Sequence, residues 1–174
     1  MVKLAVFAVV SFGITLFSWT FLRDRRTHEF YRYFAFETLL VLILANVDFW
    51  FSNPLGPLQL VSWVFLSLSL VLAVHGLHLL RVIGRPQGDF ENTTQLVIVG
   101  AYKYIRHPLY ASLLFGTWGV FLKDCTVLTV LLSAITSVFL YGTARVEESE
   151  NRARFGSEYE QYMKSTRMFL PFIF

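Results

Sequence analysis

The residues best suited to chemistry gather at positions 100–110, which read Gly-Ala-Tyr-Lys-Tyr-Ile-Arg-His-Pro-Leu-Tyr between two apolar segments. Proline suits the first turn of a helix and forces the residue before it into extended backbone, so we expect His107 to close a loop and Pro108 to begin a helix. The free N–H groups of that helix start, together with Lys103, Arg106 and His107, would form a positively charged site that donates hydrogen bonds. Such a site suits a carboxylate or phosphate at the membrane edge.

A simpler interpretation competes with this one. Lys and Arg beside a membrane-spanning helix, with tyrosines in the interfacial belt, are also what a plain topology anchor needs. Gly100 has a corresponding double role, since glycine permits either a tight turn or the close approach of a ligand.

The order of several motifs favours the chemical interpretation. They are Leu96-Val97, Gly100-Ala101-Tyr102, Arg106-His107-Pro108-Leu109-Tyr110, Glu147-Glu148 and the Phe-Gly-x-x-Tyr-x-x-Tyr pattern at 155–162. In this order they resemble the signature of the membrane-embedded methyltransferases that include isoprenylcysteine carboxyl methyltransferase and phosphatidylethanolamine N-methyltransferase. The resemblance covers roughly residues 95–171, and the first ninety or so residues carry little of it.

The resemblance implies S-adenosyl-L-methionine as cofactor and assigns roles by position. The implied cofactor-binding residues are Gln87, Gln95, Leu96, Val97, Gly100, Tyr102, His107, Pro108, Leu109, Tyr110 and Glu147. The reaction chemistry would fall to Arg106, His107 and Glu148. A carboxylate such as Glu147 can bind the ammonium or the ribose diol of that cofactor, while His107, Arg106 or free N–H groups can meet its carboxylate.

The sequence departs from this pattern at one position. The carboxyl methyltransferases have an arginine four residues before the glutamate, to meet the substrate, and here the residue is Thr143. Arg145 lies about 200° round the helix from it and is not an obvious substitute. The acceptor group therefore stays open between a carboxylate, an amine, a thiol and a quinone-like ring. An amine would need a base, for which Glu37 with His75 or His78 is a candidate, along with Arg145 on the substrate side.

Composition places the chain in a membrane. It has 174 residues, of which 55% are hydrophobic and only 16% charged, and a mean hydropathy of +0.54. The charges lie at the ends of apolar segments, so the basic pI of about 9.1 does not indicate nucleic-acid binding. The one cysteine, Cys125, excludes an internal disulfide framework and offers no metal-ligand spacing.

The apolar segments predict an all-α membrane bundle of about five transmembrane helices. They cover Val2–Leu22, Tyr33–Phe51, Leu58–Val82, Leu109–Leu122 and a fifth span from Thr126 that continues unbroken into Glu147 and Glu148. We expect one domain, 1–174, with a three-helix support region at 1–83 and a cofactor-binding region at 84–174. Ser157 and Glu160 form a capping-box pattern, which predicts a short amphipathic helix after Gly156.

The distribution of cations predicts the topology. One side would hold most of them: Arg23, Arg25, Arg26, Arg32, Arg81, Arg85, Lys103, Arg106, Arg145, Arg152, Arg154, Lys164 and Arg167. The other side would hold only Lys3 and Lys123. By the positive-inside rule we expect the N-terminus outside, the C-terminus in the cytoplasm and the active site facing the cytoplasm.

Two acids in the second span, Glu37 and Asp48, are spaced close to three helical turns apart, so both should point the same way, toward protein or water. His75 and His78 are predicted at a similar depth to Glu37, which makes a Glu37–histidine pair a candidate, either as a simple inter-helix hydrogen bond or as a base.

Two rival functions stay open at this point. Membrane sterol reductases carry a similar arginine–histidine–tyrosine segment but use NADPH, and the acidic pair with the short tail favours the sulfonium cofactor over a phosphorylated dinucleotide. The other rival is a non-catalytic lipid-binding protein. We expect the partners to be a lipophilic substrate from the bilayer and membrane lipids, with no nucleic acid; the oligomeric state and the acceptor are not encoded in any feature of the sequence.

Overall fold

The computed structural model describes residues 1–20, 22–24, 26–87 and 93–172, and the fold is all-α. Arg25 and the middle of the polar loop at 84–94 lie outside the described residues. The helices are α1 (Val2–Ser18), α2 (His28–Asn46), η1 (Val47–Phe49), α3 (Pro57–Val82), η2 (Gly100–Lys103), α4 (Pro108–Phe121), α5 (Val127–Phe155) and α6 (Ser157–Ser165).

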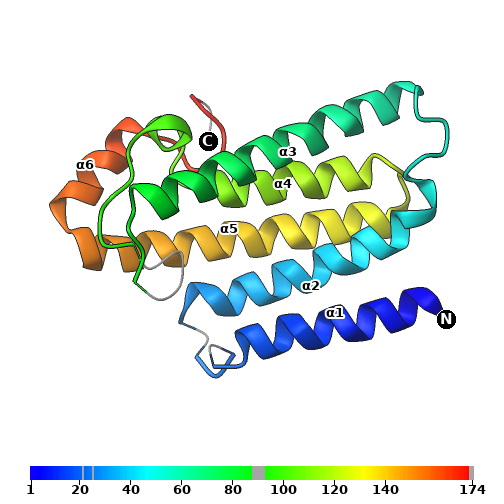
Figure 1. Ribbon diagram of the computed structural model, residues 1–174, viewed down its shortest axis with the longest axis horizontal. Helices are drawn as coiled ribbons and strands as arrows, with labels where there is room; N and C mark the ends of the chain where they lie inside the picture. Colours follow the sequence, from blue (N-terminus) through cyan, green and yellow to red (C-terminus); the bar gives the residue numbers. More distant parts are fainter. Residues whose placement is uncertain (21, 25, 88–92, 173–174) are drawn as a thin grey trace.

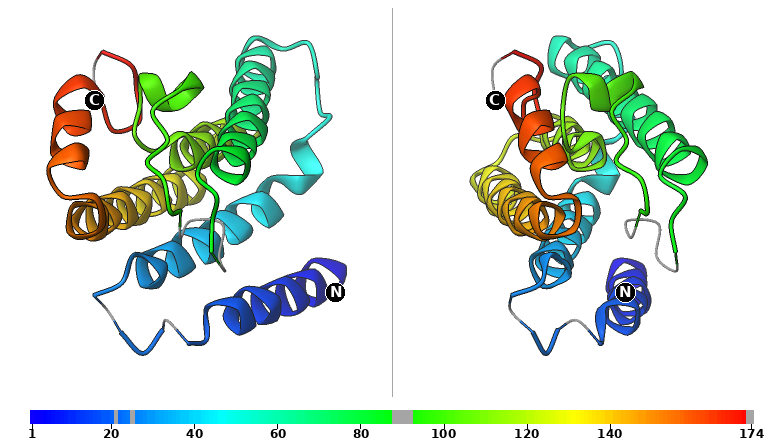
Figure 2. Two further views of the ribbon diagram at one scale, coloured as in Figure 1. Left: turned by 60° about the vertical axis from the view of Figure 1, so that its left-hand side comes forward. Right: turned by 90° about the vertical axis from the view of Figure 1, so that its left-hand side faces the viewer.

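Helices α1 to α5 lie alongside one another, while α6 and the segment around η2 gather at one end of the bundle (Figure 1). The N-terminus lies at the opposite end from the C-terminal tail (Figure 1). The closest packing pairs α3 with α4 and α2 with α5, and α1 packs against α2 at the edge of the bundle (Figure 2). This arrangement confirms the predicted helical membrane bundle.

Within the described parts of the chain, three helical segments are long and apolar enough to cross a bilayer: His28–Phe49, Pro57–Val82 and Val127–Phe155. Helices α1 and α4 are apolar but shorter than the roughly 20 residues that a straight crossing needs. The first helix ends at Ser18 rather than Leu22. The second begins at His28 rather than Tyr33, because the Glu150 carboxylate accepts a hydrogen bond from the His28 backbone N–H at 3.3 Å and so fixes an earlier start.

Helices α3 and α4 approach closely through small residues. A Cβ atom on Gly119 would lie 3.0 Å from the Leu66 side chain, and one on Gly76 would lie 3.1 Å from that of Leu109. Ser62 Oγ donates to the Gly119 carbonyl oxygen at 2.6 Å across the same contact. Small residues and hydroxyl-to-carbonyl bonds of this kind stabilise helix pairs in a bilayer, where burial of apolar surface contributes little.

Helices α2 and α5 pack through a second set of small and hydroxyl-bearing residues. Thr136 Oγ1 donates to Thr38 Oγ1 at 2.9 Å, and Ala35, Leu140 and Ala144 are almost completely buried beside them. This contact fixes the end of α5 that carries Glu147 and Glu148. As predicted, α5 continues into the acidic pair without a break.

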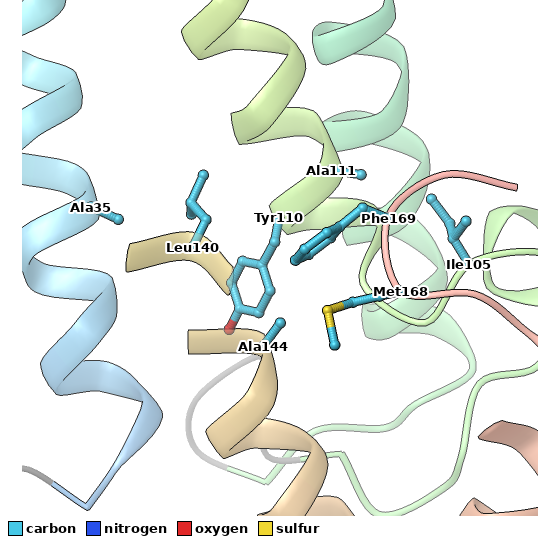
Figure 3. Packing of buried hydrophobic residues seen from close by; sticks show 8 residues of the cluster. All are labelled: Ala35, Ile105, Tyr110, Ala111, Leu140, Ala144, Met168 and Phe169. Carbon is cyan, nitrogen blue, oxygen red and sulfur yellow. The ribbon is translucent and has the colours of Figure 1, made fainter. Parts of the chain in front are cut away.

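The buried core joins both helix pairs to the C-terminal tail. Its members are Ala35, Ile105, Tyr110, Ala111, Leu140, Ala144, Met168 and Phe169 (Figure 3). We call residues 166–170 the C-terminal strap. Its backbone runs parallel to the segment before α4: Arg106 N–H donates to the Arg167 carbonyl at 2.7 Å, and His107 N–H donates to the Met168 carbonyl at 3.1 Å.

The short helix α6 begins at Ser157, as predicted, but without the predicted capping box. Gly156 is the N-cap, with φ of +56°, and no side chain caps the helix. The positive φ of Gly156 turns the chain sharply out of α5, and this sets the start of α6 in place of the Ser157–Glu160 pair.

The two acids of the second span do face the same way, and both meet α1. Ser11 Oγ donates to Glu37 Oε1 at 3.0 Å, and Lys3 forms an ion pair with Asp48. Among the described residues the Glu37–histidine pair does not form. Helix α3, which carries His75 and His78, packs on α4 and η2, whereas α2 packs on α5 and α1, so the expectation of a shared site for these residues was wrong.

Candidate active site

Two charged motifs that are distant in sequence meet at the end of the bundle that carries α6. Arg106 Nε donates to Glu148 Oε1 at 2.6 Å. His107 lies between the two acids, with Nε2 3.6 Å from Glu148 Oε1 and Nδ1 3.7 Å from Glu147 Oε2. The beginning of α4 and the end of α5 therefore bring together the arginine, the histidine and both glutamates.

This cluster is buried. The Glu148 side chain is 0% exposed and the Arg106 side chain 10% exposed. A buried charge is tolerated when it is paired and its remaining hydrogen-bonding groups are satisfied, and Arg106 meets both conditions. Its Nη1 donates to the carbonyl oxygens of Thr166, at 2.7 Å, and Met163, at 3.4 Å. Arg106 thus ties the start of α4 to α5 and to the C-terminal strap.

Two buried atoms of the cluster make no hydrogen bond to any residue that the structure describes: His107 Nε2 and Glu148 Oε2. The nearest cation to Glu148 Oε2 besides Arg106 is Arg145, whose Nη1 is 4.0 Å away and whose side chain is 55% exposed. Buried polar atoms without partners are rare, and beside a cavity they indicate groups that a ligand or water satisfies.

The helix begins at the predicted residue, although His107, with φ of −123° and ψ of 65°, is not in the extended backbone that was expected before proline. His107 is the N-cap residue and Pro108 occupies the first turn of α4. The Ala111 N–H donates to the His107 carbonyl at 2.9 Å, so the N–H groups before Ala111 are those that a helix start leaves without intrahelical partners. Gly100 has φ of +59°, and a Cβ there would lie 2.6 Å from His75 Nε2, so its close approach is to a side chain of α3.

A small cavity of about 60 Å³ lies against this cluster. Eight of the predicted site residues line it: Leu96, Val97, Tyr102, Arg106, His107, Leu109, Tyr110 and Glu147. Five others lie outside the lining: Gln87, Gln95, Gly100, Pro108 and Glu148. Gln87 and Gln95 are exposed, whereas Pro108 and Glu148 are buried behind the cavity wall.

Comparison with known proteins identifies the family of this chain. Residues 58–158, which contain every element of the cluster, match the family described as phospholipid methyltransferase. The chain belongs to the phospholipid methyltransferase family. No solved structure matches it.

Several curated relatives of this family member are methyltransferases by name. A probable protein-S-isoprenylcysteine O-methyltransferase of Oryza sativa subsp. indica is 29% identical over 129 residues, which cover 72% of this chain and 64% of the relative. Methanethiol S-methyltransferase 1 of Bradyrhizobium diazoefficiens is 27% identical over 116 residues, 63% of this chain and 39% of the relative. The chain therefore spans less than two thirds of the length of either relative.

The cavity of this phospholipid methyltransferase family member also has lining residues without an assigned role in the sequence pattern. They are Leu80, Thr93, Asn151, Phe155, Tyr159 and Tyr162. Asn151 is one helical turn after Glu147 on α5, a spacing that carries both side chains to the same face and would have identified it. Tyr159 and Tyr162 reach the cavity wall from α6.

The two tyrosines of α6 form a neutral cover. Burial raises the pKa of both Tyr159 and Tyr162, and the negative charges of Glu147 and Glu148 add to the rise for Tyr159. Tyr162 Oη donates to the Tyr102 carbonyl at 2.6 Å, which fixes α6 to η2.

The predicted substrate residues of this family member do not line the cavity. Glu37 faces α1, while His75 and His78 are exposed on α3. Thr143, at the position of the family's arginine, is fully buried, and its Oγ1 donates to the Phe139 carbonyl at 2.8 Å. Arg145 lies beside Glu148 and is half-exposed, so it is the candidate that lies nearest the acidic pair.

Two larger hollows adjoin the site. One, of about 470 Å³, is polar and lies between α6 and the segment at 96–103; it shares Leu96 and Tyr162 with the small cavity. The other, which we call the apolar groove, has about 580 Å³ and lies between α3, α4, α5 and the C-terminal strap.

Proposed function

We propose that this protein is an integral membrane methyltransferase that moves a methyl group from S-adenosyl-L-methionine to a lipophilic acceptor. The observation that carries the proposal is the meeting of the Arg106-His107-Pro108 segment with the Glu147-Glu148 pair around one cavity. The family match supports it, and so do the names of the relatives, which are methyltransferases acting on sulfur or oxygen.

The cavity residues fit this cofactor, which has an ammonium and a carboxylate at one end, a ribose diol in the middle and an adenine at the other. Glu147 lines the cavity with its side chain 20% exposed, so its carboxylate is available to an ammonium or a diol. His107 Nε2 and the first-turn N–H groups of α4 suit a carboxylate. Leu96, Val97 and Tyr102 offer apolar and aromatic surface to a base.

The small cavity is too small to hold the whole cofactor. Sites for small molecules usually measure about 300–1,000 Å³, well above the 60 Å³ of this cavity. Leu96 and Tyr162 line both this cavity and the hollow of about 470 Å³. We propose that the cofactor is admitted on this side, beneath α6, by a shift of these two side chains that breaks the bond between Tyr162 and the Tyr102 carbonyl and joins the volumes.

When bound, the cofactor supplies an electrophilic methyl group on a sulfonium, and the chain supplies orientation and electrostatics. The Glu147 carboxylate, with Glu148 behind it, gives a negative environment that favours a cationic ligand. The Arg106–Glu148 pair fixes the position of His107, and the tyrosines of α6 exclude water. If the acceptor is an amine or a thiol, a base must take its proton, whereas a carboxylate acceptor is already ionised.

Calorimetric titration of the purified full chain with S-adenosylhomocysteine tests the proposal. We expect the wild type to bind and the His107→Ala and Glu147→Ala variants to lose binding, while Glu160→Ala, in the exposed first turn of α6, binds like the wild type. Folded wild-type protein that binds no S-adenosylhomocysteine would overturn the proposal, and thermal protection by NADPH instead would favour the reductase. Equal binding by all variants would place the ligand elsewhere.

A further inference from the structure

The apolar groove lies between membrane-spanning helices. Its lining includes Phe65 from α3, Phe115 and Trp118 from α4, Val138 from α5 and Leu170 from the C-terminal strap. Ser137 also lines it, but its Oγ donates to the Ser133 carbonyl at 2.8 Å and so requires no partner in the groove. A hollow of this size with almost entirely apolar walls suits a hydrocarbon chain.

One layer of side chains separates this groove from the candidate active site. Phe169 lines the groove, and the centre of its ring is 6.2 Å from the centre of the His107 ring, which lines the small cavity. Tyr110 and Ala111 are consecutive in α4, and the first lines the cavity while the second lines the groove. Figure 3 shows the Phe169 ring beside Tyr110 and Ala111.

Phe169 is held in this layer by its backbone. The Met168 carbonyl accepts from the His107 N–H and the Arg167 carbonyl accepts from the Arg106 N–H, so the strap is aligned with the residues that enter the cavity. The Thr166 carbonyl also accepts from Arg106. By contrast, Phe172, three residues along the same tail, is 83% exposed. The strap therefore places the Phe169 ring between the groove and the cavity, whereas the Phe172 ring, beyond the strap, is exposed.

We propose that Phe169 determines which acceptors reach the active site: the apolar groove holds the hydrocarbon chain of the acceptor, and the Phe169 ring sets the width of the passage to His107. The inference rests on the proposed methyl transfer. It assigns Phe169 to acceptor selection, because the ring lines the groove, lies against His107 and is not itself part of the cavity wall. The acceptor class it favours is a single slender hydrocarbon chain with the nucleophile at its end.

Photolabelling tests the passage directly. The full-length protein in lipid nanodiscs is irradiated with a long-chain alkyl alcohol that carries a diazirine at its polar end, and labelled residues are mapped by mass spectrometry. In the wild type we expect labels on groove residues such as Trp118 and Val138. In Phe169→Ala we expect labelling of Glu147 to rise by about tenfold or more, the scale at which the shape of an apolar pocket discriminates.

Phe172→Ala is the matched control and should give the wild-type pattern. Phe169→Leu, a milder change, should give an intermediate rise, and it keeps the test decisive if the alanine variant does not fold. S-adenosylhomocysteine binding is measured on the same preparations. Unchanged Glu147 labelling in folded Phe169 variants that bind the analogue would overturn the role of Phe169 alone, as would an equal rise in Phe172→Ala. A wild type that does not bind the analogue would instead overturn the proposed function.

Discussion

The two ends of the helix bundle each bury a cation, and they hold it in different ways. At the end with α6, Arg106 is paired with a buried carboxylate, and a histidine and a second carboxylate lie beside it. At the opposite end Lys123, only 4% exposed, has neutral partners: its Nζ donates to Gln59 Oε1 at 3.0 Å and lies 3.5 Å from the centre of the Trp63 ring. Burial lowers the pKa of Lys123 accordingly.

The comparison shows that a buried charge does not by itself mark an active site. Unbonded buried atoms do not distinguish the ends either, since Asn46 Oδ1 and Trp50 Nε1 lack hydrogen bonds near Lys123 just as His107 Nε2 and Glu148 Oε2 do near Arg106. The difference lies in which charged groups converge. Among the described residues, the cavity at the α6 end has Arg106, His107 and Glu147 in its wall with Glu148 beside them, whereas the hollow of about 300 Å³ at the opposite end has only Lys123 and Asp124 as charged lining residues.

Replacement of Glu148 by alanine should give the largest effect. It leaves the Arg106 guanidinium buried without its carboxylate, and breaking a buried pair typically costs about 3–5 kcal/mol of unfolding free energy. Denaturant unfolding in detergent measures the change, with Glu160→Ala as the exposed control. A loss below about 1 kcal/mol would mean that the pair does not organise this end of the bundle.

Gly100→Ala should destabilise the same end by about 1–3 kcal/mol, because the positive φ strains any other residue and the new Cβ meets His75. The double variant with His75→Ala should recover the part due to the clash but not the part due to the backbone. Equal stability of the single and double variants would show that the ring already moves aside.

Lys123→Met should lower the unfolding free energy by about 1–2 kcal/mol, since Gln59 Oε1 then loses its donor. Because this end of the bundle has no role in the proposed site, the affinity for S-adenosylhomocysteine should stay within about twofold of the wild type, well inside the tenfold that 1.4 kcal/mol represents. A larger loss of affinity, measured by calorimetry, would contradict the division between the two ends.

Tyr162→Phe should have the smallest effect, about 1 kcal/mol, from the lost bond to the Tyr102 carbonyl. A pH dependence accompanies it. Burial raises the pKa of Tyr162, so the folded state keeps a proton that the unfolded chain releases above about pH 10, and stability falls as the pH rises past that value. The variant should flatten this fall; Tyr104→Phe, at an exposed phenol, should not.

Local signals in the sequence predicted much of the site. Pro108 marks the start of α4, because the geometry of a helix start depends mainly on the residues within it. The eight predicted residues of the cavity wall came instead from the resemblance of the ordered motifs to the methyltransferases. Hydrophobic length likewise predicted the helical segments. Their pairing was harder to predict, and the error over Glu37 and His75 arose because similar depth in a bilayer does not specify which helices are neighbours.

The contacts made by backbone groups had no sequence signal. The strap binds the segment before α4 through carbonyls of Arg167 and Met168, and any residue other than proline offers the same donor and acceptor. The start of α2 at His28 depends on Glu150, far along the chain, and the start of α6 depends on the φ of Gly156. Such features follow from tertiary structure, which a window of neighbouring residues does not contain.

The attachment of the strap to the Arg106-His107 segment also bears on how the protein is made. During synthesis helices α1 to α5 emerge before residues 166–168, so a chain that lacks the strap already has these helices but not the backbone partners of Arg106 and His107. Ligand-binding competence should therefore arise only after the strap has emerged and folded back onto helices that are already assembled.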